Sequence, residues 1–163
     1  MKLVISEAID DVLRVYDRKF KYKELHVERD VEPALTAWTL QGEFKQILSN
    51  LIANAIDASK EGGRIVIRAR SSREFRSGTP GVRITIADYG YGISAEDKAR
   101  LFTPFFTTKK EVGTGLGLWI TKDLLEKKGG HISFRSRDSK PSGTVMSVYL
   151  PLKSPAAIAD LAA

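Results

Sequence analysis

Hydrophobic residues recur at helical spacing in three long segments of the chain. Over residues 4–20, apolar side chains stand three or four positions apart with charged residues between them, which predicts an amphipathic helix. The segment 43–59 shows this spacing most strongly, and a pair of glycines follows it. A third helix is expected over about residues 114–128, again closed by two glycines.

Alternation of apolar and polar residues predicts strands elsewhere. The predicted strands cover residues 24–28, 34–40, 64–70, 82–87, 131–137 and 144–150. The polar segment 71–81 predicts a hairpin loop, and Ser94 with Asp97 three residues later predicts the start of a short helix over 94–102. Because strands and helices mix without strict alternation, the sequence predicts an α/β sandwich with a mixed sheet.

The composition narrows the class of protein. A chain of 163 residues with 42% hydrophobic and 28% charged residues is typical of one globular domain. The absence of cysteine excludes disulfides and thiolate metal sites, and two histidines are too few for a histidine-rich metal centre. No apolar run reaches the length of about 18 residues that a membrane-spanning helix needs, so we expect a cytoplasmic domain without a membrane segment.

The formal net charge of +6 suits a polyanionic partner, which could be nucleotide phosphates, nucleic acid or an acidic protein surface. Nucleic acid is suggested by the arginines Arg64, Arg68, Arg70, Arg73 and Arg76. However, no aromatic residues are interleaved with them, and outward-facing charges on a strand are usually solvated. We therefore rank nucleic-acid binding last and expect no nucleic-acid partner.

Two segments carry candidate chemistry next to predicted secondary structure. Asn50, Asn54 and Asp57 form one polar stripe on the helix 43–59, and an asparagine oxygen is a hard neutral ligand suited to Mg²⁺. Asp88 follows a strand and precedes Gly90 and Gly92, so its carboxylate could accept a hydrogen bond from a flat ligand that the glycines allow to approach. A solvated stripe and a simple turn are the alternative interpretations.

A third segment is rich in glycine and opens a predicted helix. Gly113, Gly115 and Gly117 stand at this helix start, where free N–H groups and the helix dipole favour an anion, and Lys109 precedes them. A flexible surface loop is the alternative. Neither the P-loop pattern nor the Rossmann glycine pattern is present. The sequence therefore favours a phosphate cradle of another kind.

The order of these segments resembles the motifs of one family. The motifs are Asn50–Ala58 (similar to the N box), Asp88–Gly92 (G1 box), Leu101–Lys109 (F box), Gly113–Leu118 (G2 box) and Ser142–Val145 (last glycine motif). Over roughly residues 3–152 the chain resembles the catalytic ATP-binding domain of bacterial two-component histidine kinases. These kinases share the Bergerat fold with gyrase, chaperone and mismatch-repair ATPases.

The resemblance implies a fold and an organisation. Residues 1–152 would form one catalytic domain, in which a layer of about three helices covers a mixed sheet. Residues 104–113 would form a flexible ATP lid, which we expect to be the most mobile internal segment without nucleotide. An alanine-rich tail, residues 153–163, would follow the domain.

The resemblance also implies roles for individual residues toward ATP and Mg²⁺. Asn54 would hold Mg²⁺ with support from Asn50, Asp88 would accept a hydrogen bond from the adenine amino group, and Thr144 would bind near the same base edge. Catalytic roles would fall to Asn54 and Lys109. Further nucleotide contacts would come from Asp57, Gly90, Gly92, Ile93, Leu101, Gly113, Thr114, Gly115, Leu116, Gly117 and Leu118.

Departures from the family pattern bear on the reaction. Asn50 stands where the ATP-hydrolysing relatives place a glutamate that activates water, which favours a kinase. Neither His26 nor His131 lies in a sequence like the family's phosphoacceptor helix. The resemblance thus implies transfer to a histidine on a separate dimerisation domain, with a response regulator downstream, by a catalytic domain that is monomeric alone. An anti-sigma-type serine kinase or a pseudokinase is the alternative.

Overall fold

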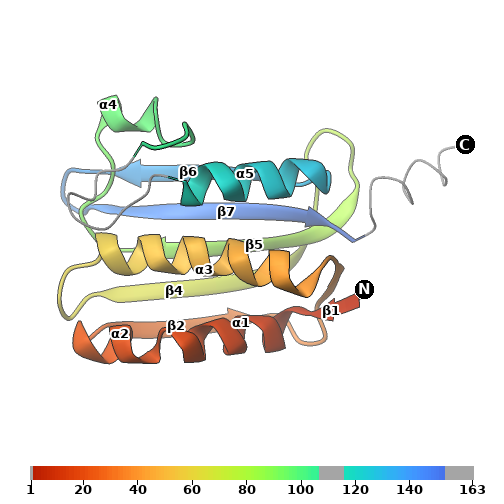
Figure 1. Cartoon of the computed structure of the whole chain (residues 1–163), viewed down its shortest axis with the longest axis horizontal. Coiled ribbons are helices and arrows are strands. Elements are labelled where there is room, and N and C mark those ends of the chain that lie inside the picture. The colour runs from red at the N-terminus through yellow and green to blue at the C-terminus, as the bar shows by residue number, and fades with distance from the viewer. Residues whose placement is uncertain (1, 107–115, 153–163) are drawn as a thin grey trace, which may run out of the picture.

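The structure is a computed structural model that describes residues 2–106 and 116–152, and it consists of a mixed sheet with helices packed on one face (Figure 1). The helices are α1 (Ile5–Val15), α2 (Asp17–Tyr22), α3 (Gln41–Ala58), α4 (Ala95–Lys98) and α5 (Gly117–Lys127). The strands are β1 (Lys2–Val4), β2 (His26–Val31), β3 (Thr36–Trp38), β4 (Arg64–Arg73), β5 (Pro80–Asp88), β6 (His131–Arg137) and β7 (Gly143–Pro151). The predicted α/β sandwich with a mixed sheet is confirmed.

The main sheet has five strands in the order β2-β4-β5-β7-β6. Only the pair β2–β4 is parallel, and the other neighbours in this sheet are antiparallel. Helices α1, α3 and α5 lie side by side across one face, in agreement with the expected layer of about three helices (Figure 1). Strands β1 and β3 form a separate two-stranded sheet.

The alternation along β4 separates the two faces of the sheet. Ile65, Ile67 and Ala69 are fully buried beneath the helices. The intervening arginines point to the open face, where Arg64 pairs with Glu28 at 2.7 Å and Arg70 with a carboxylate of β2 at 2.6 Å. These arginines are thus largely neutralised by the neighbouring strand, which agrees with the solvated interpretation of this charge.

The prediction of one helix over residues 4–20 is wrong in two respects. Residues 2–4 form β1 instead, because Leu3 pairs with Ala37 of β3. The helical region then breaks at Tyr16, whose backbone (φ −94°, ψ 4°) separates α1 from α2. The Tyr16 hydroxyl donates to the carbonyl of Ser49 on α3 at 3.3 Å, so a contact with another helix accompanies the break.

Two of the predicted helix ends are confirmed, whereas α4 stops at Lys98, short of the predicted residue 102, and α3 ends at Ala58, before the glycine pair expected to close it. The Ser94 hydroxyl accepts a hydrogen bond from the backbone N–H of Asp97 at 3.2 Å, which confirms the predicted N-cap. Helix α5 ends where Gly129 adopts φ +76° and Gly130 donates its N–H to the carbonyl of Leu125 at 2.8 Å. Within the described residues, no helix has the length and apolar character needed to cross a membrane.

Candidate functional site

A buried carboxylate lies at the end of a central strand. Asp88 is the last residue of β5 and is only 7% exposed. Its Oδ1 accepts the N–H of Gly90 at 3.0 Å, and the N–H of Thr144 also donates to the carboxylate. Burial raises the pKa of Asp88 to about 6, and these two hydrogen bonds oppose that rise. At neutral pH the site thus presents a poorly solvated hydrogen-bond acceptor.

The glycines that follow Asp88 are required by the protein's own packing. A Cβ on Gly90 would overlap the carbonyl of Ala58 at the end of α3, and one on Gly92 (φ +76°) would overlap the carbonyl of Arg137. The N–H of Tyr91 donates to the carbonyl of Ala58 at 3.1 Å. The loop is therefore clamped between α3 and the end of β6, and this close packing fixes the surroundings of Asp88.

Thr144 lies directly beside Asp88 on the neighbouring strand. The two residues are register partners in the β5–β7 pair, and Thr144 is 5% exposed. Its Oγ1 lies 2.7 Å from the Oγ of Ser136 on β6, and Ser136 accepts the N–H of Ile93 at 2.8 Å. The structure thus brings Asp88, Thr144 and Ile93 together, as the sequence predicts.

Asn50, the first residue of the polar stripe on α3, contacts the start of α5. The side-chain amide of Asn50 donates to the carbonyl of Gly117 at 3.2 Å and to the hydroxyl of Thr121 at 3.2 Å. Asn54 is partly buried one helical turn later, and Asp57 is exposed near the end of α3. Asn50 is therefore oriented by two contacts with α5 and lies beside the N-terminus of that helix.

Gly117 differs from the glycines after Asp88. A Cβ at this position would make only ordinary contacts with the side chain of Asn50, so the protein's own packing does not require glycine here. Gly117 opens α5, an 11-residue helix whose first N–H groups carry the positive end of the helix dipole. The N-terminal end of this helix, with its positive dipole, suits an anionic group.

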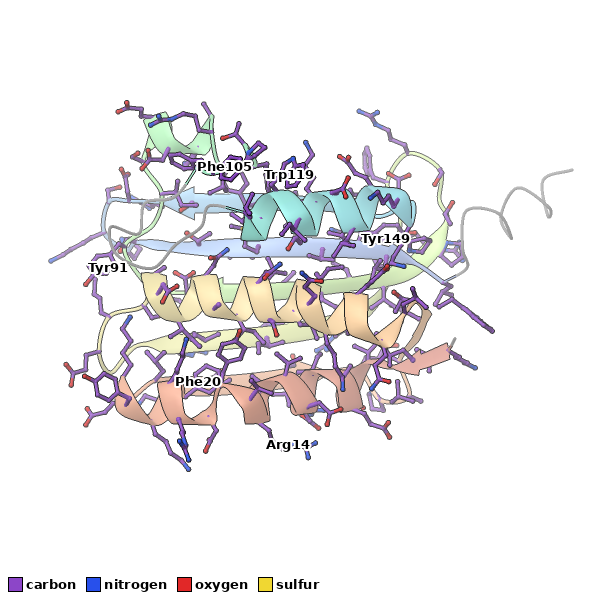
Figure 2. All side chains as sticks on the ribbon, in the orientation of Figure 1. Arg14, Phe20, Tyr91, Phe105, Trp119 and Tyr149 are labelled. Carbon is purple, nitrogen blue, oxygen red and sulfur yellow. The ribbon has the colours of Figure 1, made fainter. Side chains whose placement is uncertain are left out.

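Hydrophobic residues border this region and also belong to the core. Ile93, Leu101 and Leu118 are partly buried and pack against the main hydrophobic cluster, and Leu116 is partly buried as well. Exposed aromatic side chains stand on the loop after β5, after α4 and on α5. They are Tyr91, Phe105 and Trp119, which are 61%, 75% and 42% exposed and are labelled in Figure 2.

Several expected site residues lie outside the described residues. They are Lys109, Gly113, Thr114 and Gly115, together with residues 107–113 of the expected lid. Their roles, and the expected mobility of the lid, therefore stay predictions.

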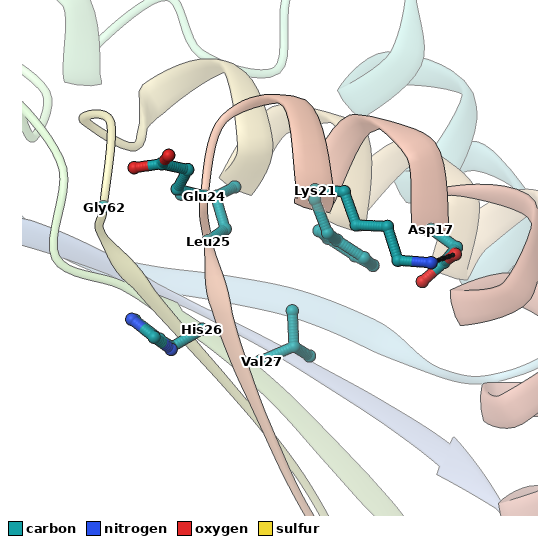
Figure 3. Close-up of a pocket in the computed structure, with 8 residues that line it drawn as sticks. Asp17, Lys21, Glu24, Leu25, His26, Val27 and Gly62 are labelled. Atoms are coloured by element: carbon teal, nitrogen blue, oxygen red, sulfur yellow. Dashed lines mark ion pairs between the residues drawn. The ribbon is translucent and has the colours of Figure 1, made fainter.

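A groove of about 510 Å³ lies apart from these residues, at the end of α2 (Figure 3). It is lined by Asp17, Phe20, Lys21, Glu24, Leu25, His26, Val27 and Gly62. Asp17 and Lys21 form an ion pair with each other at 2.8 Å across one turn of α2. None of the predicted site residues lines this groove, so we do not place the candidate functional site there.

Sequence reasoning missed two polar residues that support the site. Thr121 is fully buried and donates to the carbonyl of Gly117 at 2.8 Å, and Ser136 bridges Ile93 and Thr144. Ser136 follows Ile132 and Phe134 at strand spacing, so a polar residue on an apolar stripe was a usable signal. Thr121 stands four residues after Gly117, where a helical side chain can return to that carbonyl.

Comparisons with known proteins identify the family and the fold of this chain. The family model described as "Histidine kinase-, DNA gyrase B-, and HSP90-like ATPase" matches residues 39–154. The sensor histidine kinase ZraS of Salmonella typhi is 41% identical over 107 residues, which is 66% of this chain and 21% of that protein. The chain thus spans about a fifth of the length of this curated relative.

Solved structures show the same fold. The catalytic domain of histidine kinase ThkA, in a nucleotide-free form, is similar with a TM-score of 0.78 and 30% identity, covering 93% of this chain and 95% of that one. The structure of ThkA in complex with the response regulator protein TrrA matches with a TM-score of 0.75 and 28% identity, covering 94% of this chain and 42% of that one.

Proposed function

The chain belongs to the family of histidine kinase-, DNA gyrase B- and HSP90-like ATPases, and on this premise we propose that it is the catalytic domain of a sensor histidine kinase. It would bind ATP with Mg²⁺ and transfer the γ-phosphoryl group to a histidine on a separate dimerisation domain. The observation that carries this proposal is the buried Asp88 carboxylate, which lies between the end of α3 and the start of β7.

Asp88 would select the base. Its carboxylate accepts two backbone N–H groups and retains acceptor capacity for one more donor, which suits the exocyclic amino group of adenine. Guanine carries a carbonyl oxygen at the equivalent position, and two acceptors would face each other there. Ionised Asp88 therefore favours ATP over GTP.

The phosphates would extend from the base toward the start of α5. The N–H groups at the start of this helix support this placement, as does a glycine at position 117 that the protein's own packing does not require. Asn50 and Asn54 present amide groups from α3, and amide oxygens fit a hard cation that keeps waters and phosphate oxygens among its ligands. Mg²⁺ held there would neutralise charge on the phosphates, with Asn54 as the direct ligand.

The reaction would then depend mainly on positioning. The bond between the γ-phosphorus and the β,γ-bridging oxygen breaks, a bond from that phosphorus to the acceptor histidine nitrogen forms, and ADP leaves with the bridging oxygen. Asn50 is held by Gly117 and Thr121 and has no carboxylate to activate water. We therefore expect slow ATP hydrolysis.

Neither histidine of this chain is placed to be the acceptor. His131 stacks on Tyr149 with the ring centroids 5.1 Å apart, and its register places it five residues, or about 17 Å, along the strands from Asp88. It points to the open face of the sheet, whereas Asp88 faces the helices. His26 lies on the edge strand β2. The acceptor would thus come from another domain.

The partners and the cellular location of the chain follow from this assignment. The likeness to ThkA, whose structure is known in complex with a response regulator, supports a response regulator as the downstream partner. We further propose that residues 1–152 fold as a single unit, monomeric on its own, in the cytoplasm where ATP is available.

Radiolabelled ATP tests the proposal. The chain is incubated with a dimerisation domain that carries the acceptor histidine, and acid-labile, base-stable label on that domain is the expected result. The same domain with its histidine replaced by glutamine is the control. Failure of the parent chain to bind ATP, or label on the control, would contradict the proposal.

A further inference from the structure

We propose that Ser136 is a positioning residue that fixes the Thr144 hydroxyl at the edge of the purine and thereby sharpens discrimination between adenine and guanine nucleotides. The inference rests on the proposed nucleotide site and extends it, because Ser136 lies outside the motifs that identify that site. Strand β6, for which the sequence motifs give no role in binding, would thereby contribute to recognition of the base.

Strand register aligns Ser136 with Thr144 and Asp88. Ser136 and Thr144 are register partners in the β6–β7 pair, just as Thr144 and Asp88 are in the β5–β7 pair. Three neighbouring strands thus place Ser136, Thr144 and Asp88 in one row across the sheet. Partners in such a row project to the same face, so the three side chains point toward the helices.

Ser136 ties together the segments that surround the base position. Its hydroxyl oxygen accepts the N–H of Ile93 at 2.8 Å and lies 2.7 Å from Thr144 Oγ1 and 3.1 Å from the carbonyl of Gly143. The carbonyl of Ser136 accepts from the ammonium group of Lys98 at 2.7 Å. Loop, strand and helix α4 are therefore all joined through this one residue.

The number of protons on the two hydroxyl groups determines whether Thr144 can donate a hydrogen bond to a ligand. Each hydroxyl has a single proton, and Ser136 can give its own either to Gly143 or to Thr144. If Ser136 donates to Gly143, Thr144 must donate to Ser136 and can only accept from a ligand. If Ser136 donates to Thr144, the Thr144 proton is available for a ligand. Ser136 thus lets Thr144 act as a donor while keeping its rotamer fixed.

The donating arrangement matches adenine. Adenine presents its amino group as a donor and the adjacent ring nitrogen N1 as an acceptor, whereas guanine presents a carbonyl oxygen and an N1–H. Asp88 as acceptor and Thr144 as donor, directly or through one water, complement the first pattern and oppose the second. Without Ser136, the Thr144 hydroxyl loses its partner and is free to rotate, so the contact with adenine weakens.

Guanine nucleotides gain nothing from this contact, so its loss should affect ATP selectively. Dissociation constants for ATP and GTP are measured in Mg²⁺ by competition with a fluorescent ATP analogue. Ser136→Ala should weaken ATP binding about three- to tenfold and change GTP binding less than twofold. In a Thr144→Val background, Ser136→Ala should leave the ratio of the two constants unchanged.

Ser133→Ala is the matched control, because Ser133 lies on the same strand but is exposed on the open face. A second pair of variants separates loss of the hydroxyl from loss of folding. Ser136→Thr keeps the hydroxyl and should retain discrimination, whereas Ser136→Val, which is isosteric with that threonine, should lose it. An unchanged ratio in both Ser136→Ala and Ser136→Val, or equal weakening for ATP and GTP, would overturn the inference. A parent chain that binds neither nucleotide would instead overturn the proposed function, and this inference with it.

Discussion

The side-chain amide of Asn50 on α3 donates a hydrogen bond to the carbonyl of Gly117, the first residue of α5, at 3.2 Å. The two residues are 67 positions apart in the chain, and their contact joins the polar stripe of α3 to the helix N-terminus that would receive the phosphates. The same amide also donates to Thr121. Asn50 is therefore both a part of the proposed site and a link between two helices.

Replacing Asn50 should destabilise the protein as well as impair the site. Asn50→Ala removes two hydrogen bonds and leaves the carbonyl of Gly117 with one fewer donor, which should lower the free energy of unfolding by about 1–2 kcal/mol. Urea denaturation measures this change. Gln46→Ala, an exposed position on the same helix, is the control and should stay within about 0.5 kcal/mol of the parent. Equal stability of the two variants would contradict the structural role of Asn50.

Gly90→Ala should be poorly tolerated because its Cβ would overlap the carbonyl of Ala58. The clamped loop would have to move away from α3, at a cost of about 1–3 kcal/mol in the free energy of unfolding. Gly42→Ala in the first turn of α3 is the matched control, because nothing lies within 4 Å of the Cβ it would introduce. That variant should be neutral or slightly stabilising. Thermal unfolding of both variants compares them, and an unperturbed Gly90→Ala protein would disagree with the packing described here.

Asp88 should make folding stability depend on pH. Its pKa in the folded protein is about 6, above the ordinary value of 3.8, because burial disfavours the charged form. Between these values the folded chain holds a proton that the unfolded chain has lost. Stability should therefore fall as pH rises from about 4 to 6 and then level off.

Asp88→Asn removes this ionisation. Without nucleotide, the variant should be more stable than the parent at pH 7.5, by about 1–3 kcal/mol, and the difference should shrink toward pH 4. Denaturant titrations at several pH values measure it. Asp17→Asn, at a largely exposed position, is the control and should not gain stability at pH 7.5. A variant less stable than the parent at pH 7.5 would show that hydrogen bonding outweighs burial at Asp88.

The chain alone should bind ATP without labelling itself. Both histidines lie on strands away from the proposed phosphate position, and His131 points to the opposite face of the sheet. Incubation with radiolabelled ATP, followed by acid and base treatment, should therefore give no acid-labile label on the isolated chain. Nucleotide-dependent label on His26 or His131 would contradict the separate acceptor domain.

The sequence pattern predicted correctly those elements that a short stretch of chain determines by itself. The strand β6 was predicted at its observed bounds, because apolar and polar residues alternate along its whole length and Gly129 and Gly130 mark its start. The capping of α4 by Ser94 was confirmed for the same reason. In contrast, β1 exists because Leu3 pairs with Ala37, a contact between distant segments that periodicity in residues 4–20 cannot show.

The candidate site likewise contains residues that the sequence motifs indicated and a residue that only the fold reveals. Motif order indicated Asp88, Asn50 and Thr144, and the structure brings Asp88 together with Thr144 and Asn50 together with α5. Ser136 was missed because its role arises only from the register of β6 against β7. The sequence also suggested that the glycines after Asp88 admit a ligand, whereas Gly90 admits the carbonyl of Ala58.

Titration of ATP against the parent chain and Asp88→Asn, in Mg²⁺ at pH 7.5, tests the adenine site most directly. The parent should bind ATP, and the variant should bind it about 10- to 100-fold more weakly, because a charged acceptor in a buried position is lost. GTP should compete poorly with ATP on the parent, and Asp17→Asn should bind ATP as the parent does. Equal ATP affinity in the parent and Asp88→Asn would show that Asp88 does not receive the base.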